Sequence, residues 1–157
     1  MTPVDDCGAP DTGRFLRHAE WLLANGCDGL NVLGTTGEAT SFSQAQREAL
    51  MSAAARLGAD RMMVETGVSD LPTTVALTRA AHSAGYAAAL ILPPFYYKSV
   101  SDAGLHAYIA ALADATASAP ILNYLYNFPT LQLPGDAGAA FRTRFPGPYQ
   151  GARGQLG

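Results

Sequence analysis

Residues 28–38 read DGLNVLGTTGE and contain the signals of a strand followed by a turn. Its first part is a short apolar run bounded by glycines, which predicts a strand that ends at Gly34. The following Thr35-Thr-Gly-Glu38 predicts a turn. Ser43-Gln-Ala-Gln46 is a capping-box pattern, which predicts that a helix begins there and runs to about Leu57. Strand, turn and helix in this order form one βα unit.

The same alternation recurs along the chain. Apolar runs typical of strands begin near residues 28, 61, 86 and 120, and helical patterns also cover residues 12–25, 72–84 and 101–118. The opening Thr2-Pro3-Val4 fits the end of an earlier strand. A period of about 30 residues is typical of βα units with parallel strands and right-handed crossovers. Two architectures are open on this pattern, a doubly wound sheet and a (β/α)8 barrel.

Composition narrows the function classes. The chain has 157 residues, of which 48% are hydrophobic and 15% charged, so it is long enough for one domain with a sizeable core. Its 10 basic and 13 acidic residues leave no electrostatic footprint for nucleic acid. No apolar run reaches the roughly 18–20 residues of a membrane span, and no signal-peptide pattern is present. Neither Cys7 and Cys27 nor the three histidines have metal-ligand spacing. We expect a cytoplasmic protein with no metal, membrane or nucleic-acid partner.

Three polar segments each follow a predicted strand. Gly34-Thr-Thr-Gly-Glu38 has glycines for a tight turn, with hydroxyls and amides that can bind a small anion; the alternative is a plain βα turn. Pro93-Pro-Phe-Tyr-Tyr-Lys98 carries tyrosines that can relay a proton or stabilise an oxyanion; the alternative is aromatic packing at a subunit contact. Tyr126-Asn-Phe-Pro129 follows the last predicted strand. Because the carboxyl ends of barrel strands line the active site, the three segments are expected to meet at one rim.

Four segments have the order and spacing found in one enzyme family: Thr2-Pro3, Gly34-Thr-Thr-Gly-Glu38, Pro94-Phe-Tyr96 and Tyr126-Asn-Phe-Pro129. Over residues 2–146 the chain resembles the dihydrodipicolinate synthase / N-acetylneuraminate lyase family. The resemblance implies an α/β fold, a partial (β/α)8 TIM barrel of about the first five βα units, with residues 1–146 as its domain. It also implies class I aldolase chemistry on a pyruvate-type 2-oxo acid, no cofactor, and a homo-oligomer for the full-length form.

The resemblance also implies roles for individual residues. In this family a lysine at the end of the sixth strand forms a Schiff base with the 2-oxo acid, and the iminium accepts electrons while a carbon–carbon bond forms or breaks. Tyr126 would move protons at the Schiff base, and Thr35 would link it by hydrogen bonds to Tyr96, which reaches in from a neighbouring subunit. Thr36, with the backbone of the turn at Gly34, would hold the substrate carboxylate. Tyr126, Thr35 and Tyr96 are thus the implied catalytic residues, and Thr36 and Gly34 the implied substrate-binding residues.

The chain departs from the family at the lysine. Its single lysine is Lys98, directly after the tyrosines, whereas the family lysine belongs to a segment resembling Lys-Asp-Ser-Ser-Gly beyond the fifth strand. A complete barrel also needs roughly 200–250 residues, so about three βα units are expected to be missing. We predict that the chain as given is truncated and inactive in Schiff-base chemistry.

The tail predicts a cause for this departure. When the reading frame of residues 149–157 is shifted by one base, the permitted codons include Ile-Lys-Gly-Leu-(Glu or Gly)-Asp-Ser-Ser-Gly. The Glu or Gly codon before Asp needs one further base change to become the family lysine. We predict a frame shift near Pro148, which makes residues 147–157 a tail outside the family pattern. Two further hypotheses stay open: a non-catalytic half-barrel that pairs with another chain, and a small α/β domain that binds an anion at Gly34–Glu38.

Overall fold

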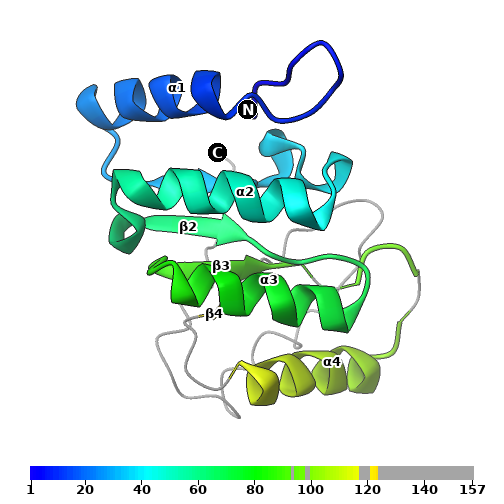
Figure 1. The fold of residues 1–157 in the computed structure, drawn as a ribbon. Helices are drawn as coiled ribbons and strands as arrows, with labels where there is room; N and C mark the ends of the chain where they lie inside the picture. The colour runs from blue at the N-terminus through cyan, green and yellow to red at the C-terminus, as the bar shows by residue number, and fades with distance from the viewer. Residues whose placement is uncertain (93, 98–99, 117–120, 124–157) are drawn as a thin grey trace, which may run out of the picture.

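The computed structural model describes residues 1–92, 94–97, 100–116 and 121–123. In this part of the chain, helices and strands alternate from α1 to β4 (Figure 1). The elements are α1 (Thr12–Ala24), β1 (Leu30–Val32), α2 (Gln44–Ala54), β2 (Met62–Glu65), α3 (Leu71–Ser83), β3 (Ala88–Ile91), α4 (Asp102–Ala115) and β4 (Ile121–Asn123). Apart from the strand expected at residues 2–4, each strand and helix predicted for these residues is present, with ends somewhat shorter than expected.

The strands form one parallel sheet in the order β1-β2-β3-β4. Val32 pairs with Val64, Val64 with Ala89, and Ala89 with Ile121. Helices α2, α3 and α4 lie on one face of this sheet, and each contacts the next helix along the chain (Figure 1). A doubly wound sheet reverses its strand order and carries helices on both faces. The sequential order is instead that of consecutive βα units of a (β/α)8 barrel.

Two apolar clusters hold the helices on the sheet. The larger cluster includes Leu50 of α2, Val64 of β2 and Leu77 of α3, none of which is exposed. The smaller cluster joins Ile91 of β3 to Leu112 of α4. All residues of β3 are buried, as its continuous apolar sequence predicts for a strand covered on both faces.

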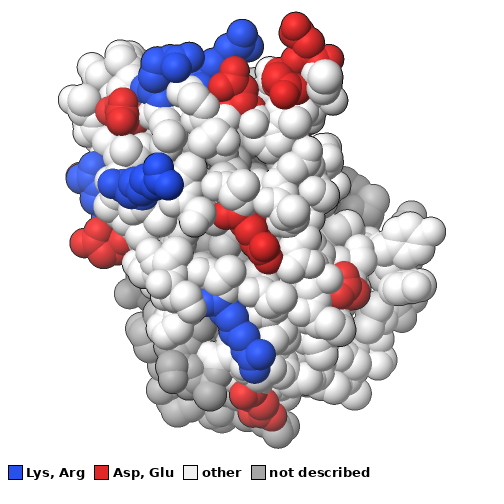
Figure 2. All heavy atoms as spheres, viewed as in Figure 1, with Lys and Arg blue, Asp and Glu red and all other residues white. Residues whose placement is uncertain are grey.

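Charged side chains of both signs lie on the face drawn in Figure 2. On the face drawn in Figure 2, basic and acidic residues of the described part lie interspersed among uncharged ones and form no patch of a single sign. None of the helices described here combines the length and the apolar character needed to cross a bilayer.

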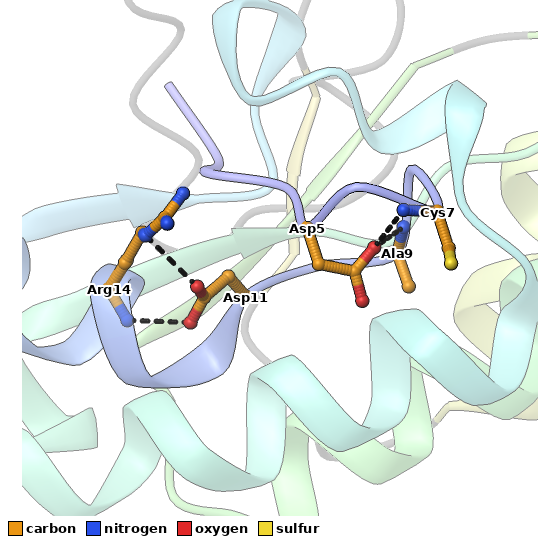
Figure 3. A network of polar contacts seen from close by, with 5 residues as sticks. All are labelled: Asp5, Cys7, Ala9, Asp11 and Arg14. Carbon is orange, nitrogen blue, oxygen red and sulfur yellow. Dashed lines mark hydrogen bonds and ion pairs between the residues drawn. The ribbon is translucent and has the colours of Figure 1, made fainter.

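Residues 2–4 form no strand of the sheet, contrary to the expectation from sequence. Val4 instead makes an isolated antiparallel bridge with Pro10. The Asp5 carboxylate explains the difference, because its Oδ1 accepts two hydrogen bonds of 2.9 Å from amides within the loop and folds the chain back (Figure 3). The loop ends at Asp11, which begins α1.

Helix starts follow the local sequence. The capping box predicted at Ser43 is present: the Gln46 amide donates to Ser43 Oγ at 3.3 Å, and the Ser43 amide donates to Gln46 Oε1 at 2.9 Å. The Asp11 and Asp70 carboxylates accept amide hydrogen bonds of 2.9 and 2.8 Å in the first turns of α1 and α3. A short 3-10 turn after α2 ends at Gly58, whose φ of 106° suits glycine.

Candidate functional site

The threonine turn, residues 34–38, follows β1 at the carboxyl edge of the sheet. β1 pairs with β2 as far as Val32, which lies opposite Val64. The chain then turns at Leu33, which has a φ of 58° although it is a buried leucine. Positive φ is uncommon for a bulky residue, so the surrounding structure must hold this kink. The kink is what directs residues 34–38 out of the sheet.

The turn presents two hydroxyls to solvent. The Gly37 amide donates to the Gly34 carbonyl at 2.7 Å and closes a 3-10 turn over Thr35–Gly37. Thr35 and Thr36 are exposed, whereas both glycines are buried. The hydroxyls of exposed threonines suit a small anion such as a carboxylate. The structure therefore brings Gly34, Thr35 and Thr36 together in one turn.

Close packing explains the two glycines of the turn. A Cβ at Gly34 would lie 2.8 Å from Asn31 Nδ2, and a Cβ at Gly37 would lie 3.2 Å from Thr2 Oγ1. Thr2 is buried, and its hydroxyl donates to the Gly37 carbonyl at 2.7 Å across 35 residues of sequence. The N-terminal segment and the threonine turn are thus joined directly at the rim.

A buried charged pair lies beside the turn and was missed by sequence reasoning. Arg47 of α2 is 1% exposed and Glu65, the last residue of β2, is 2% exposed. Arg47 Nη2 donates to the Glu65 backbone carbonyl at 2.8 Å. Glu65 follows Val64, the partner of Val32, so it lies next to the kink at Leu33. Two sequence signals could have indicated this pair. A glutamate ends an apolar strand, and an arginine stands three residues before the buried Leu50.

The environment shifts both ionisable groups. Burial raises the pKa of the Glu65 carboxyl from 4.5 to about 7, and the Arg47 guanidinium only partly opposes this. Burial likewise lowers the pKa of Arg47, with Glu65 opposing. Arg47 Nε and Glu65 Oε2 have no hydrogen-bond partner among the described residues. A carboxyl that titrates near neutral pH therefore lies at the rim.

Hydroxyl groups fix the loop that follows β2. Thr66 and Thr78 share a hydrogen bond of 2.8 Å between their Oγ1 atoms. Thr74 Oγ1 accepts from the Val68 amide at 3.1 Å and from the Tyr108 hydroxyl at 3.1 Å. These bonds tie the loop after β2 to α3, and α3 to α4.

Tyr96 follows β3 and lies at the surface. Its side chain is 73% exposed, that of Tyr97 is 68% exposed, and the two rings meet edge to face at 5.2 Å. Within the described ranges, no hydrogen bond joins Tyr96 to Thr35. Tyr126 and Lys98 lie outside the described residues, as does the predicted tail. The part of the chain that the structure describes contains no group of three His, Cys, Asp or Glu side chains fit to hold a metal ion.

Comparison with known proteins gives consistent matches. The Dihydrodipicolinate synthetase family matches residues 1–133. A 4-hydroxy-tetrahydrodipicolinate synthase from Parasynechococcus marenigrum is 40% identical over 134 residues, which cover 82% of this chain and 42% of the relative. A crystal structure of dihydrodipicolinate synthase from Agrobacterium tumefaciens superposes with a TM-score of 0.87 at 30% identity, over 96% of this chain and 54% of the other. A prophage protein of the dihydrodipicolinic acid synthase family from E. coli K12, solved in complex with pyruvate, superposes with a TM-score of 0.73 at 29% identity, over 83% of this chain and 43% of the other.

Sequential parallel βα units with a polar turn at the strand ends define part of a (β/α)8-barrel protein. The chain belongs to the dihydrodipicolinate synthetase family. It spans about half the length of the relatives it matches, from 42% of the synthase from Parasynechococcus to 54% of the Agrobacterium structure.

Proposed function

We propose that the chain carries part of the substrate site of a lyase or synthase that makes or breaks a carbon–carbon bond beside a pyruvate-type 2-oxo acid. The observation that carries this proposal is the threonine turn, because two exposed threonines stand at the carboxyl edge of the sheet. The chain also covers the N-terminal part of a family with a member solved in complex with pyruvate.

In the proposed chemistry a lysine amine adds to the 2-oxo carbon and water leaves, which gives an iminium. Electrons from the neighbouring carbon–carbon or carbon–hydrogen bond then flow to the iminium nitrogen. Thr36 and the backbone of the turn at Gly34 hold the carboxylate. Thr35 links Tyr126 by hydrogen bonds to Tyr96 of a second copy, so the complete site belongs to a homo-oligomer. We place this oligomer in the cytoplasm.

The lysine itself is the point at which this chain differs. Lys98 is its single lysine and follows the exposed tyrosines rather than a sixth strand. The chain as given is therefore proposed to bind a 2-oxo acid without forming the Schiff base. Resequencing the coding DNA from the Phe145 codon onward tests the proposed frame shift: a one-base frame correction, together with a second single-base change in the codon before Asp, should restore a lysine before Asp-Ser-Ser-Gly, and an unchanged reading frame would contradict it.

Reductive trapping tests the reaction class. The chain as given and the frame-corrected product are incubated with pyruvate and borohydride, and their intact masses are compared. We expect a reduced pyruvate adduct on the corrected product alone, mapped to the restored lysine. A Lys98→Arg variant of the chain as given is the control, because it has no lysine. An adduct that appears on the chain as given and disappears in this variant would contradict the proposal, as would a corrected product that traps no pyruvate.

A further inference from the structure

Thr2 and Glu38 lie outside the proposed ligand contacts, and both act on the backbone of the threonine turn at Gly37. The Thr2 hydroxyl donates to the Gly37 carbonyl. Glu38, the next residue after Gly37, has a left-handed backbone conformation. We propose that Thr2 and Glu38 are positioning residues, which keep Thr35 and Thr36 in the one backbone conformation that binds a carboxylate. This inference rests on the proposed function and adds residues that the family resemblance does not assign.

Thr2 acts through its hydroxyl. The residue is 8% exposed, and its hydroxyl donates to the Gly37 carbonyl at 2.7 Å. A buried hydroxyl that lost this partner would be left unsatisfied, so the bond persists in the folded chain. A Cβ at Gly37 would approach Thr2 Oγ1 to 3.2 Å, which shows that the two residues are matched closely. The turn is therefore tied to a segment 35 residues away in sequence.

Glu38 acts through its backbone. It has φ 55° and ψ 37°, a left-handed conformation that strains any residue with a Cβ. The side chain is exposed and makes no hydrogen bond or ion pair within the described part of the chain, so nothing in the carboxylate compensates the strain. Backbone bonds hold the residue instead: the Glu38 amide donates to the Thr35 carbonyl at 3.1 Å, and the Ser41 amide donates to the Glu38 carbonyl at 2.9 Å.

Strain held by the surrounding structure is commonly found where a ligand site must be rigid. Glycine at position 38 would relieve the strain but would let the backbone leave this conformation. A turn that is already ordered loses less entropy when it binds an anion. Leu33 has a similar φ of 58° on the other side of the turn, but it is buried, so replacing it would also damage the core. Thr2 and Glu38 are the positions where the effect can be measured separately.

Four variants of the chain as given test the inference with matched controls. Thr2→Val removes the hydroxyl and Thr2→Ser keeps it. Glu38→Gly removes the strain and the carboxylate, whereas Glu38→Ala removes the carboxylate alone. The measurements are pyruvate binding by NMR titration, the melting temperature, and hydrogen exchange of the Gly37 amide, which donates to Gly34.

We expect Thr2→Val and Glu38→Gly to weaken pyruvate binding roughly five- to tenfold and to speed exchange of the Gly37 amide. Thr2→Ser and Glu38→Ala should stay within about twofold of the original chain. Glu38→Gly should melt at a higher temperature than Glu38→Ala while it binds pyruvate more weakly. A purely structural role would move stability and binding in the same direction.

Equal binding and equal Gly37 exchange in Glu38→Gly and Glu38→Ala would overturn the role of Glu38. Thr2→Ser behaving like Thr2→Val would overturn the role of the Thr2 hydroxyl. If the original chain binds no pyruvate, the proposed function fails, and exchange of the Gly37 amide alone decides whether Thr2 and Glu38 hold the turn. Faster exchange in Thr2→Val and Glu38→Gly then supports the positioning roles, and unchanged exchange rejects them.

Discussion

Arg47 Nη2 donates a 2.8 Å hydrogen bond to the backbone carbonyl of Glu65 at the end of β2. β1 leaves the sheet at Leu33 beside this point, so the guanidinium supplies a donor where the neighbouring strand turns away. Two residues 18 apart in sequence thereby fix the strand end next to the threonine turn.

The raised pKa of Glu65 predicts a pH-dependent stability. Its carboxyl titrates near pH 7 in the folded chain and near 4.5 when exposed, so the folded state holds the proton more tightly. Stability from this group is greatest below pH 4.5 and falls as the pH rises to about 7. At about 1.4 kcal/mol per pKa unit, the loss reaches roughly 3 kcal/mol.

Urea unfolding at pH 5 and pH 8 measures this loss of unfolding free energy. Glu65→Gln should be more stable than the original chain at pH 8 and similar at pH 5; a difference independent of pH would contradict the assignment.

Arg47→Met should destabilise the chain at pH 8 by about 1–3 kcal/mol, because the Glu65 carbonyl loses its donor and the carboxylate loses its buried counter-charge. The loss should shrink at pH 5, where the Glu65 carboxyl is neutral. Introducing Arg47→Met into Glu65→Gln provides the control, since the charge effect is then absent. The same loss at both pH values would mean that only packing and the carbonyl bond are involved.

Tyr86→Phe should cost about 1 kcal/mol of unfolding free energy. The Tyr86 hydroxyl is buried and donates to the Met51 carbonyl at 2.8 Å, and burial also raises its pKa. Tyr97→Phe is the matched control, because Tyr97 is exposed and the same change should leave stability unaltered. Equal melting temperatures for the two variants would show that the Tyr86 bond contributes no net stability.

The exposed tyrosines predict self-association. Tyr96 and Tyr97 place two aromatic rings at the surface, and Val100, three residues further along the chain, is also exposed. Exposed apolar groups and open strand edges favour contacts between chains. Size-exclusion chromatography should give species larger than a 16.4 kDa monomer, and Tyr96→Ser combined with Tyr97→Ser should reduce them. A compact monomer that melts cooperatively would argue against the half-barrel hypothesis.

Local patterns predicted most of the fold. The capping box at Ser43 and the burial of β3 depend on residues close in sequence, so they could be predicted directly. The βα period alone does not fix the strand order, because it fits both a barrel and a doubly wound sheet; the family resemblance is what implied the barrel. The kink at Leu33 also carries no local signal, since leucine is an ordinary strand residue.

The candidate site was predicted unevenly for the same reason. Gly34, Thr35 and Thr36 share one turn, so their proximity follows from sequence. The bonds from Thr2 to Gly37 and from Arg47 to Glu65 span 35 and 18 residues and depend on strand register, which sequence patterns do not fix. The roles of Tyr96 and Tyr126 remain predictions from the family resemblance.

The most direct test of the account is a titration of the isotope-labelled chain with pyruvate, followed by the amide signals of residues 34–38. We predict saturable shifts confined to this turn, with binding weakened about tenfold in Thr36→Val and preserved in Thr36→Ser. Methyl pyruvate, which lacks the carboxylate, should leave the same signals in place. Shifts elsewhere in the chain with none in the turn, or equal shifts with the methyl ester, would contradict the claim that the threonine turn binds the carboxylate of a 2-oxo acid.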